Sequence, residues 1–411
     1  MTILSVFMAV SYVSGHEVPD AQDAAMYQVN PRVFAADHSF NAVTRQLDSI
    51  AALGVNVLWF MPVYEIGVEK SVNSPYCIKD YLSLNPEFGT VKEFDTMVRE
   101  AHKRGMSVIL DWVANHTSWD SVWMEEHPEW FTRDSRGNII HPAGTGWEDV
   151  ADLDYGNREM RNAMIDAMKY WVEEHGVDGF RCDAADYVPF DFWQQAVRAL
   201  REIPDRKLLL LAEGQRKDHF DAGFDMNYAW GYLAALRQVY HKGAPVTELI
   251  KADSLEYAGL QPGKVKLRFT TNHDEAVHAP AVVEFDGERG AIAAFVAATY
   301  LHGGMLIYDS QEVAFPERID FFRYVPVDWS SNPGYREEYK YLVDFYNSHP
   351  AIRKGDLTAY PDNDVLMFSR RYGSDCVFVA VNMRNKAVSV DSPAGKLHFG
   401  PYEYILRNIT E

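Results

Sequence analysis

Short apolar runs alternate with longer amphipathic segments along the chain from about residue 24. Between residues 158 and 174, Met160, Met164, Met168 and Trp171 recur at helical spacing, which predicts one buried helix face. The same period predicts helices at 41–53, 91–104 and 190–201. The apolar runs predict eight strands, at 25–27, 55–60, 107–111, 177–181, 208–212, 224–225, 266–270 and 306–308.

Eight strands that alternate with helices predict an α/β fold, a (β/α)8 TIM barrel. The alternating pattern breaks after the third strand, where a stretch rich in Trp, Gly and His is too long for an ordinary loop and predicts an inserted subdomain. Near the C-terminus, 365–371 and 376–381 flank Gly373-Ser374 and predict a hairpin of a small antiparallel β-sandwich domain. We therefore expect a barrel at 16–115 and 155–354, an insertion at 116–154, and a C-terminal domain at 355–411.

The chain is acidic, with 39 Lys and Arg against 59 Asp and Glu in 411 residues and a net charge of −20. Such a surface repels phosphate backbones, so we expect no nucleic-acid partner, whereas neutral sugars or a bound cation suit it. The three cysteines, Cys77, Cys182 and Cys376, have neither metal-site nor disulfide-framework spacing.

The first fifteen residues allow two interpretations. Residues 3–13 are mostly apolar and precede Ser14-Gly15, which suits a signal segment and export to the periplasm or the medium. However, no Lys or Arg precedes the apolar run, which favours a first strand or an arm of a cytoplasmic protein. No other stretch reaches the apolar length of a membrane span. The oligomeric state is left open.

Polar residues cluster directly after four of the predicted strands. Barrel enzymes place catalytic groups at the carboxyl ends of their strands, so four such clusters in order predict one active site. The clusters are Asp111…Asn115-His116, Gly179-Phe-Arg181-Cys-Asp183, Glu213-Gly214, and Asn272-His273-Asp274.

These four clusters make the sequence resemble the α-amylase superfamily, glycoside hydrolase family 13. Three further stretches of the chain agree with that family, and the resemblance runs from about Met26 into the C-terminal domain. These stretches are Gly54 to Pro62, Asp152-Leu-Asp154, and Gly303 to Tyr308 with Gln311-Glu312.

The resemblance implies a catalytic role for three carboxyl groups. Retaining cleavage of a glycosidic bond needs one carboxylate to attack the anomeric carbon and one carboxylic acid to protonate the departing oxygen. The resemblance implies Asp183 as nucleophile, Glu213 as acid/base, and Asp274 as the carboxylate that binds sugar hydroxyls and stabilises the transition state. No cofactor is required for this chemistry.

The resemblance also implies four substrate contacts. His116 and His273 match histidines that hydrogen-bond the sugar at the cleavage point, and Tyr76 matches an aromatic residue that stacks on it. Arg181 precedes Asp183 by two positions, so its side chain shares one face of the strand and keeps Asp183 ionised. Glu213 must hold a proton near this cation, which predicts a raised pKa.

Asp111, Asn115 and Asp152 are assigned to support rather than to chemistry. The resemblance implies that Asp111 braces the barrel through a hydrogen bond or an ion pair. Asn115 and Asp152 match positions that bind a structural Ca²⁺ in many relatives. Asp186 and Tyr187 stand where many α-amylases carry Lys-His, whose His carbonyl joins that site, so a Ca²⁺ here stays open.

The resemblance implies hydrolysis of α-1,4-linked glucans or maltooligosaccharides, with two alternatives. The same residues serve a transglycosylase or an enzyme acting on sucrose, trehalose or α-1,6 bonds, because the acceptor that reaches the covalent intermediate decides the product. A non-catalytic carbohydrate-binding or transporter-associated homologue is the second alternative; the complete set of three carboxylates argues against it.

Overall fold

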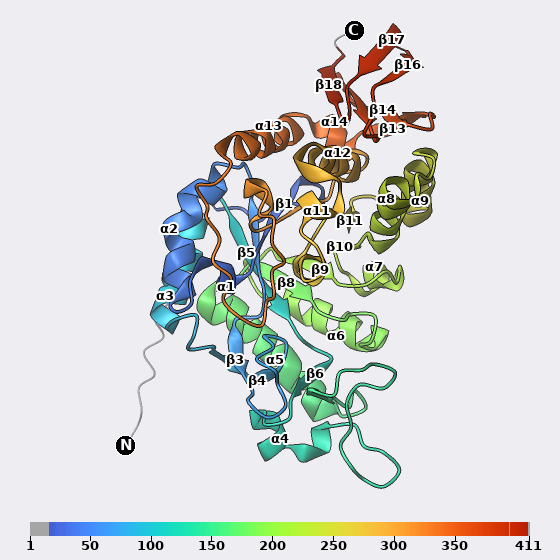
Figure 1. The fold of residues 1–411 in the computed structure, drawn as a ribbon. Helices are drawn as coiled ribbons and strands as arrows, with labels where there is room; N and C mark the ends of the chain where they lie inside the picture. The colour runs from blue at the N-terminus through green and yellow to red at the C-terminus, as the bar shows by residue number, and fades with distance from the viewer. Residues whose placement is uncertain (1–15, 394, 410–411) are drawn as a thin grey trace.

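Eight parallel strands form the centre of the fold in a computed structural model, which describes residues 16–393 and 395–409 (Figure 1). The segment at 1–15, for which we expected a signal or an arm, lies outside the described residues. The sheet order is β11-β10-β9-β8-β5-β2-β1-β12. The strands are β1 Ala25–Val29, β2 Val57–Phe60, β5 Ser107–Trp112, β8 Gly179–Cys182, β9 Leu209–Ala212, β10 Met226–Tyr228, β11 Val265–Leu267 and β12 Met305–Tyr308.

The sheet closes on itself between its first and last members. Just beyond β11, Arg268 forms a parallel bridge with Met305, and the N–H of Leu306 donates to the carbonyl of Arg268 at 3.0 Å. Every residue of the eight strands is buried, as expected where helices cover a parallel sheet. The predicted (β/α)8 barrel is confirmed.

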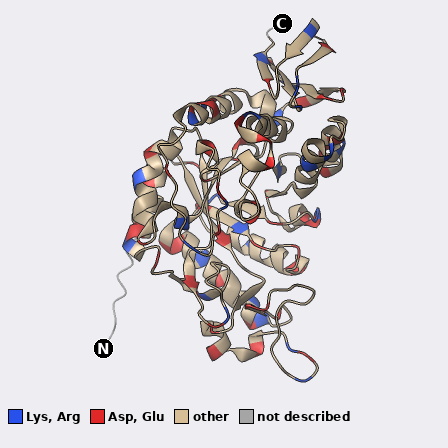
Figure 2. Cartoon of the chain, viewed as in Figure 1, with Lys and Arg blue, Asp and Glu red and all other residues tan. Residues whose placement is uncertain are grey.

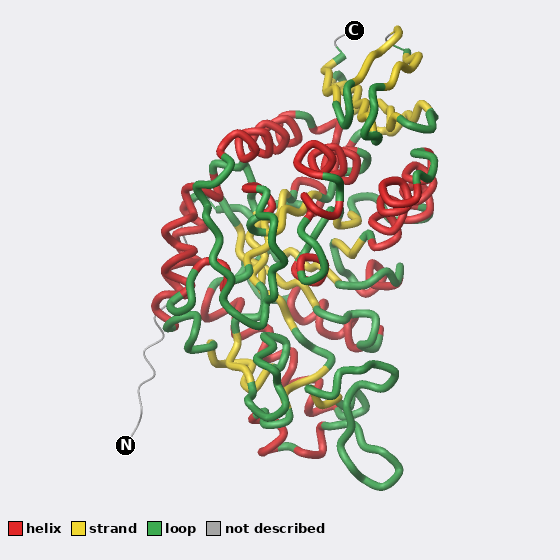
Figure 3. The backbone as a smooth tube through the Cα atoms, in the orientation of Figure 1, coloured by secondary structure: helices red, strands yellow, loops and turns green. Residues whose placement is uncertain are grey.

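Helices surround the strands on the outside of the barrel (Figure 3). Helix α3 begins with a capping box, in which the Thr90 side chain accepts from the Glu93 N–H and Glu93 accepts from the Thr90 N–H. The longer helices are α2 Ser39–Ala51, α3 Val91–Lys103, α5 Arg158–His175, α6 Phe190–Arg201, α8 Trp230–Lys242, α9 Thr247–Tyr257, α12 Gly287–Tyr300 and α13 Pro333–Ser348. Short ones are η1 Ala21–Asp23, α1 Pro31–Phe34, α7 Asp218–Ala222, α10 His273–Ala276, α11 Ala281–Glu284, η3 Gln311–Val313 and α14 Pro350–Lys354.

The sixth strand lies later in the chain than its apolar pattern predicted. Residues 224–225 were expected to form it, but β10 begins at Met226. The N–H of Asp225 donates to the Leu210 carbonyl, and its own carbonyl accepts from the Val265 N–H. Its carboxylate accepts from the N–H of Leu210 at 2.9 Å and pairs with Arg201, and the register with β11 begins only at Met226. The prediction was wrong because the pattern alone could not assign the Asp225 side chain to a partner.

The inserted segment is held at both ends. Strands β6 His116–Ser118 and β7 Val150–Asp152 pair antiparallel, with His116 opposite Asp152. Between them lie α4 Val122–Glu126, η2 Pro128–Trp130 and long loops at the bottom of Figure 1. A second hairpin, β3 Tyr64–Ile66 with β4 Ile78–Leu84, borders the insertion, and Tyr81 of this hairpin packs on Trp123 at 4.7 Å between ring centroids.

The C-terminal residues form a small antiparallel unit. Strands β13 Asp356–Tyr360, β14 Val365–Tyr372, β15 Asp375–Asn382 and β18 Tyr404–Asn408 make one sheet, which contains the predicted hairpin. The hairpin β16 Val388–Ser392 and β17 Gly395–Phe399 covers one face of that sheet, where Val390, Leu397 and Phe399 pack with Val365, Met367 and Phe378.

Charged residues of both signs are spread over the helices around the barrel (Figure 2). Across residues 16–393 and 395–409, no helix is both long enough and apolar enough to cross a membrane.

Candidate active site

A pocket of about 420 Å³ opens at the carboxyl ends of the barrel strands. Residues that follow β5, β8 and β9 meet there with residues of the insertion and of the hairpin β3–β4. Of the seven residues with predicted catalytic or substrate-binding roles, five line the pocket: Tyr76, His116, Asp183, Glu213 and Asp274. The other two, Arg181 and His273, are buried behind its wall.

Arg181 connects three carboxylates beneath the pocket. Its Nη1 lies 2.7 Å from Oδ1 of Asp111 and 2.8 Å from Oδ1 of Asp183, and its Nη2 lies 3.0 Å from Oε2 of Glu213. Arg181 and Asp183 share a side of the chain because side chains alternate along β8, and β9 presents Glu213 alongside. The expected orientation of Arg181 toward Asp183 is therefore present.

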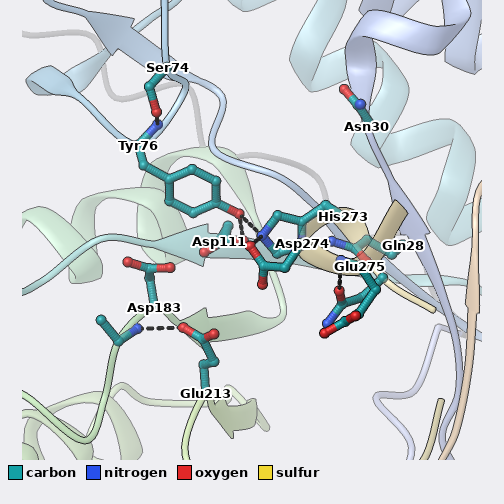
Figure 4. Close-up of polar contacts among 12 residues, drawn as sticks. Gln28, Asn30, Ser74, Tyr76, Asp111, Asp183, Glu213, His273, Asp274 and Glu275 are labelled. Atoms are coloured by element: carbon teal, nitrogen blue, oxygen red, sulfur yellow. Dashed lines mark hydrogen bonds and ion pairs between the residues drawn. The ribbon is translucent and has the colours of Figure 1, made fainter. Parts of the chain in front are cut away.

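Glu213 is held next to Asp183 by the main chain. The N–H of Ala184 donates to Oε2 of Glu213 at 2.7 Å (Figure 4), and Ala184 has a left-handed φ of 45°. Burial raises the pKa of Glu213 to about 7, against the opposing charge of Arg181. Burial also raises the pKa of Asp183, while Arg181 and a hydrogen bond with Glu213 favour its ionised form.

Asp111 serves as an anchor under the pocket floor. Besides the ion pair with Arg181, its Oδ2 accepts from Trp59 Nε1 at 3.2 Å and from the hydroxyl of Tyr76 at 3.0 Å. Burial raises the pKa of Asp111 to about 8, the charges of Asp183 and Glu213 add to the rise, and the charge of Arg181 opposes it. The side chain does not line the pocket, so its contacts match the bracing role implied by the sequence.

Tyr76 and His273 form a stacked pair with 5.4 Å between ring centroids. Gln28 Nε2 lies 2.7 Å from His273 Nδ1, and the Tyr76 hydroxyl lies 2.6 Å from His273 Nε2 (Figure 4). If Gln28 donates, His273 carries its proton on Nε2 and donates to Tyr76, whose own proton goes to Asp111. Burial lowers the pKa of His273, so the imidazole in this series of hydrogen bonds is neutral.

His116 and Asp274 both line the pocket. His116 lies on β6 against the ring of Trp147, and burial lowers its pKa to about 4, which keeps it neutral. A neutral imidazole both donates and accepts, as a sugar hydroxyl requires. Asp274 lies in the first turn of α10, 3.3 Å from His273 Nε2, and burial raises its pKa.

The structure adds pocket residues that the sequence patterns did not single out. Trp147 and Asp149 come from the insertion, whose Trp-rich composition was the only signal for them. Trp230 follows β10, and the misplaced sixth strand hid its position at a strand end. Phe321 lies in a long loop after η3 and gave no signal.

The Ca²⁺ ligation expected of Asn115 and Asp152 stays a prediction. The Asn115 carbonyl accepts from the Leu153 N–H, and its side-chain Nδ2 lies 3.2 Å from His116 Nδ1. One amide and one carboxylate fall short of the six to eight oxygens that Ca²⁺ takes. Among the described residues, the one cluster of three or more His, Cys, Asp or Glu within reach of a metal is His16, His102 and Asp178, which does not include Asp152.

Comparison with known proteins agrees with this architecture. The family model "Alpha amylase, catalytic domain" matches residues 31–285, more than half of the chain. The alpha-amylase MalA of Haloarcula japonica is 27% identical over 395 residues, which cover 91% of this chain and 57% of that protein. The chain spans about half the length of the first curated relatives it matches.

Two solved structures share the fold over nearly their whole length. An alpha-amylase from Lactobacillus plantarum is 27% identical, with a TM-score of 0.85 over 95% of this chain and 99% of that one. A noncanonic maltogenic alpha-amylase from Thermotoga neapolitana is 25% identical, with a TM-score of 0.83 over 95% and 97%. From the ordered strand-end clusters, the closed barrel and the family match, the chain belongs to the α-amylase superfamily, glycoside hydrolase family 13.

Proposed function

We propose that this protein is a retaining glycosidase that hydrolyses α-1,4-glucosidic bonds in starch-type glucans or maltooligosaccharides through a covalent glucosyl-enzyme. The observation that carries the proposal is the single guanidinium of Arg181 in contact with both Asp183 and Glu213. Two carboxyl groups held by one guanidinium lie close together, which supports a retaining enzyme, whose groups are about 5–5.5 Å apart, over an inverting one, whose groups are roughly 6.5–9.5 Å apart.

The chemistry follows from the protonation states. Asp183, ionised against Arg181, attacks the anomeric carbon, while protonated Glu213 gives its proton to the departing glycosidic oxygen. Glu213, now a carboxylate, takes a proton from a water molecule, and the resulting hydroxide oxygen displaces Asp183 from the sugar. By taking this proton Glu213 is restored to its acid form, and the departure of Asp183 from the sugar restores its carboxylate, so both groups end as they began.

The pocket lining supports a neutral sugar as substrate. Five aromatic side chains offer ring faces: Tyr76, Trp147, Tyr187, Trp230 and Phe321. Five carboxylates line the same space, and no Lys or Arg is among the described residues that line it: Asp149, Asp183, Asp186, Glu213 and Asp274. A phosphorylated sugar would meet like charge, whereas sugar hydroxyls donate to carboxylates.

The α-1,4 linkage is supported by the relatives, which include several named alpha-amylases. Transfer of the glucosyl group to a second sugar is the alternative. One relative, a maltosyltransferase from Rhodospirillum rubrum, is 26% identical to this chain over 89% of its length. The same two carboxyl groups would serve this transfer, with a sugar hydroxyl in place of water.

The test is incubation of the purified protein with maltoheptaose, followed by NMR of the products and of their first-formed anomer. Asp183→Asn removes the proposed nucleophile, and Asp166→Asn is the matched control, because Asp166 is exposed on α5 outside the pocket. Short α-anomeric products, absent with Asp183→Asn, support the proposal. First-formed β-anomers would overturn retention, and longer products would identify a transferase. Inertness toward maltoheptaose, sucrose, trehalose and isomaltose would overturn catalysis.

A further inference from the structure

A second cavity, of about 260 Å³, lies at the end of the barrel opposite the candidate active site. Its lining residues precede barrel strands: Gln22 comes before β1, Lys264 and Val265 stand at the start of β11, and His302 comes before β12. The active-site residues follow their strands instead. The C-terminal sheet closes the cavity with Arg370 of β14, so the cavity lies at the junction of the two units.

The lining of this cavity is basic although the whole chain is acidic. Lys264, Arg353, Lys354, Arg370 and His302 line it, and no Asp or Glu is among the described residues that do. Arg353 and Lys354 share one carboxylate, that of Asp23, with contacts of 2.6 Å each. Lys264 lies 4.0 Å from a carboxylate, that of Asp225, which also pairs with Arg201. His302 bonds the carboxylate of Asp253, and burial lowers the pKa of His302, so it adds no fixed charge. The cavity therefore keeps an excess of positive charge, because in the described part of the chain its lysines and arginines outnumber the carboxylates that pair with them.

Arg370 is the buried cation that lines this cavity without a carboxylate partner among the described residues. It is 1% exposed, and its Nε and Nη1 donate to the carbonyls of Ala351 at 3.2 Å and Leu301 at 2.7 Å. Within the described residues, no carboxylate forms an ion pair with it. Arg353 adds a buried Nε that has no hydrogen-bond partner in the structure. Buried charges and buried donors are normally paired, because removal from water is costly.

We propose that this cavity binds a phosphate group, either as inorganic phosphate or as part of a small sugar phosphate. Two guanidinium groups match the oxygens of a phosphate, and flanking lysines add charge. The bound group would join α14 and β14 to the start of the barrel strands, because its donors come from both units. It would thus stabilise the docking of the C-terminal sheet without contact with substrate.

Binding is tested by thermal unfolding and calorimetry of the full chain in rising sodium phosphate, with sodium chloride and sodium sulfate at matched ionic strength. A parallel series with glucose 6-phosphate separates the two sources of the phosphate group. A ligand that binds only the folded state raises Tm with its concentration. We expect a phosphate-dependent rise beyond that in chloride. A rise that chloride reproduces, or none with either phosphate source, would overturn the proposal.

Two variants locate the site. Arg370→Met removes the buried charge, and Lys354→Gln removes a partly exposed one, which keeps the test available if Arg370→Met fails to fold. The matched control is Lys251→Gln, because Lys251 also pairs with a single carboxylate, Glu248, but lies outside the cavity. We expect phosphate to bind either cavity variant about tenfold more weakly or worse, with the control unchanged. Equal affinity in Lys354→Gln and in the control would place the ion elsewhere and overturn the assignment.

Discussion

The main-chain N–H of Ala184 donates a 2.7 Å hydrogen bond to Oε2 of Glu213. Ala184 directly follows Asp183, so the loop after β8 fixes the candidate acid relative to the candidate nucleophile. Ala184 presents this donor with a left-handed φ of 45°, a conformation that costs an L-residue roughly 1–2 kcal/mol and that is a genuine outlier for β-branched residues.

Substitution of Ala184 should therefore separate backbone geometry from side-chain chemistry. Ala184→Gly keeps the N–H and suits the left-handed φ, so we expect stability within about 1 kcal/mol of the parent and retained kcat/KM. Ala184→Val should lower the free energy of unfolding by about 1–3 kcal/mol and reduce kcat/KM. Urea denaturation and steady-state kinetics measure both. Equal kinetics for the two variants would argue against this positioning.

The pH dependence of activity should follow Glu213. Its pKa is raised to about 7 and the acid must be protonated, so kcat/KM should fall as pH rises through about 7. Asp183 must be ionised, so activity should also fall at low pH. Glu213→Gln should lower kcat/KM on maltooligosaccharides by roughly 10²–10⁴ and remove the alkaline limb. An alkaline limb that persists in this variant would assign the titration to another group.

Removal of the Arg181 charge should be costly for folding. Arg181→Met leaves Asp111, Asp183 and Glu213 without their shared cation in a buried site, so we expect a loss of about 3–5 kcal/mol in the free energy of unfolding. Arg104→Met is the matched control, because Arg104 pairs with Asp48 and Glu100 at the surface and should contribute at most about 1 kcal/mol. Similar losses in urea denaturation of the two variants would contradict the central role of Arg181.

The carboxylates of the pocket should make the enzyme less active on negatively charged sugars than on neutral ones. An aryl α-maltoside and its 6-phosphorylated counterpart should differ by at least about 100-fold in kcat/KM, in favour of the neutral sugar. Asp186 lines the pocket, held by the N–H groups of Gln215 and Arg216 at 3.1 and 3.3 Å. Asp186→Lys should reduce the ratio of kcat/KM between the neutral and the phosphorylated sugar, and Asp186→Asn should reduce this ratio less. Preference of the parent enzyme for the phosphorylated sugar would refute the neutral-substrate proposal while leaving the catalytic one intact.

Chelation should have little effect on the protein. Asn115 and Asp152 offer one amide and one carboxylate to a cation, so we expect dialysis against EDTA to leave Tm and activity unchanged. Metal analysis of the purified protein accompanies the measurement. A lower Tm that added Ca²⁺ restores would instead show that the two residues hold an ion together with further oxygens.

Much of this molecule was predictable because its signals are local. Periodicity located the helix at Arg158–His175 and the hairpin strands at Val365–Tyr372 and Asp375–Asn382, since both depend on residues near in sequence. The four polar clusters at strand ends predicted one active site at the carboxyl ends of the barrel strands. The two-residue spacing of Arg181 and Asp183 predicted their pairing, because side chains alternate along a strand.

The tertiary structure decided what depends on distant partners. The apolar pattern predicts Asp225 in a strand, whereas its carboxylate pairs with Arg201 and accepts from the N–H of Leu210 just before β10 begins. The pKa of Glu213 reflects burial and three charged neighbours, which only the closed barrel assembles. No sequence pattern indicated the Arg370 cavity, because its cations come from segments as distant in the chain as Lys264 and Arg370. Sequence periodicity determined which elements form and which residues do chemistry, whereas desolvation and long-range pairing determined how those residues are charged and what else the molecule holds.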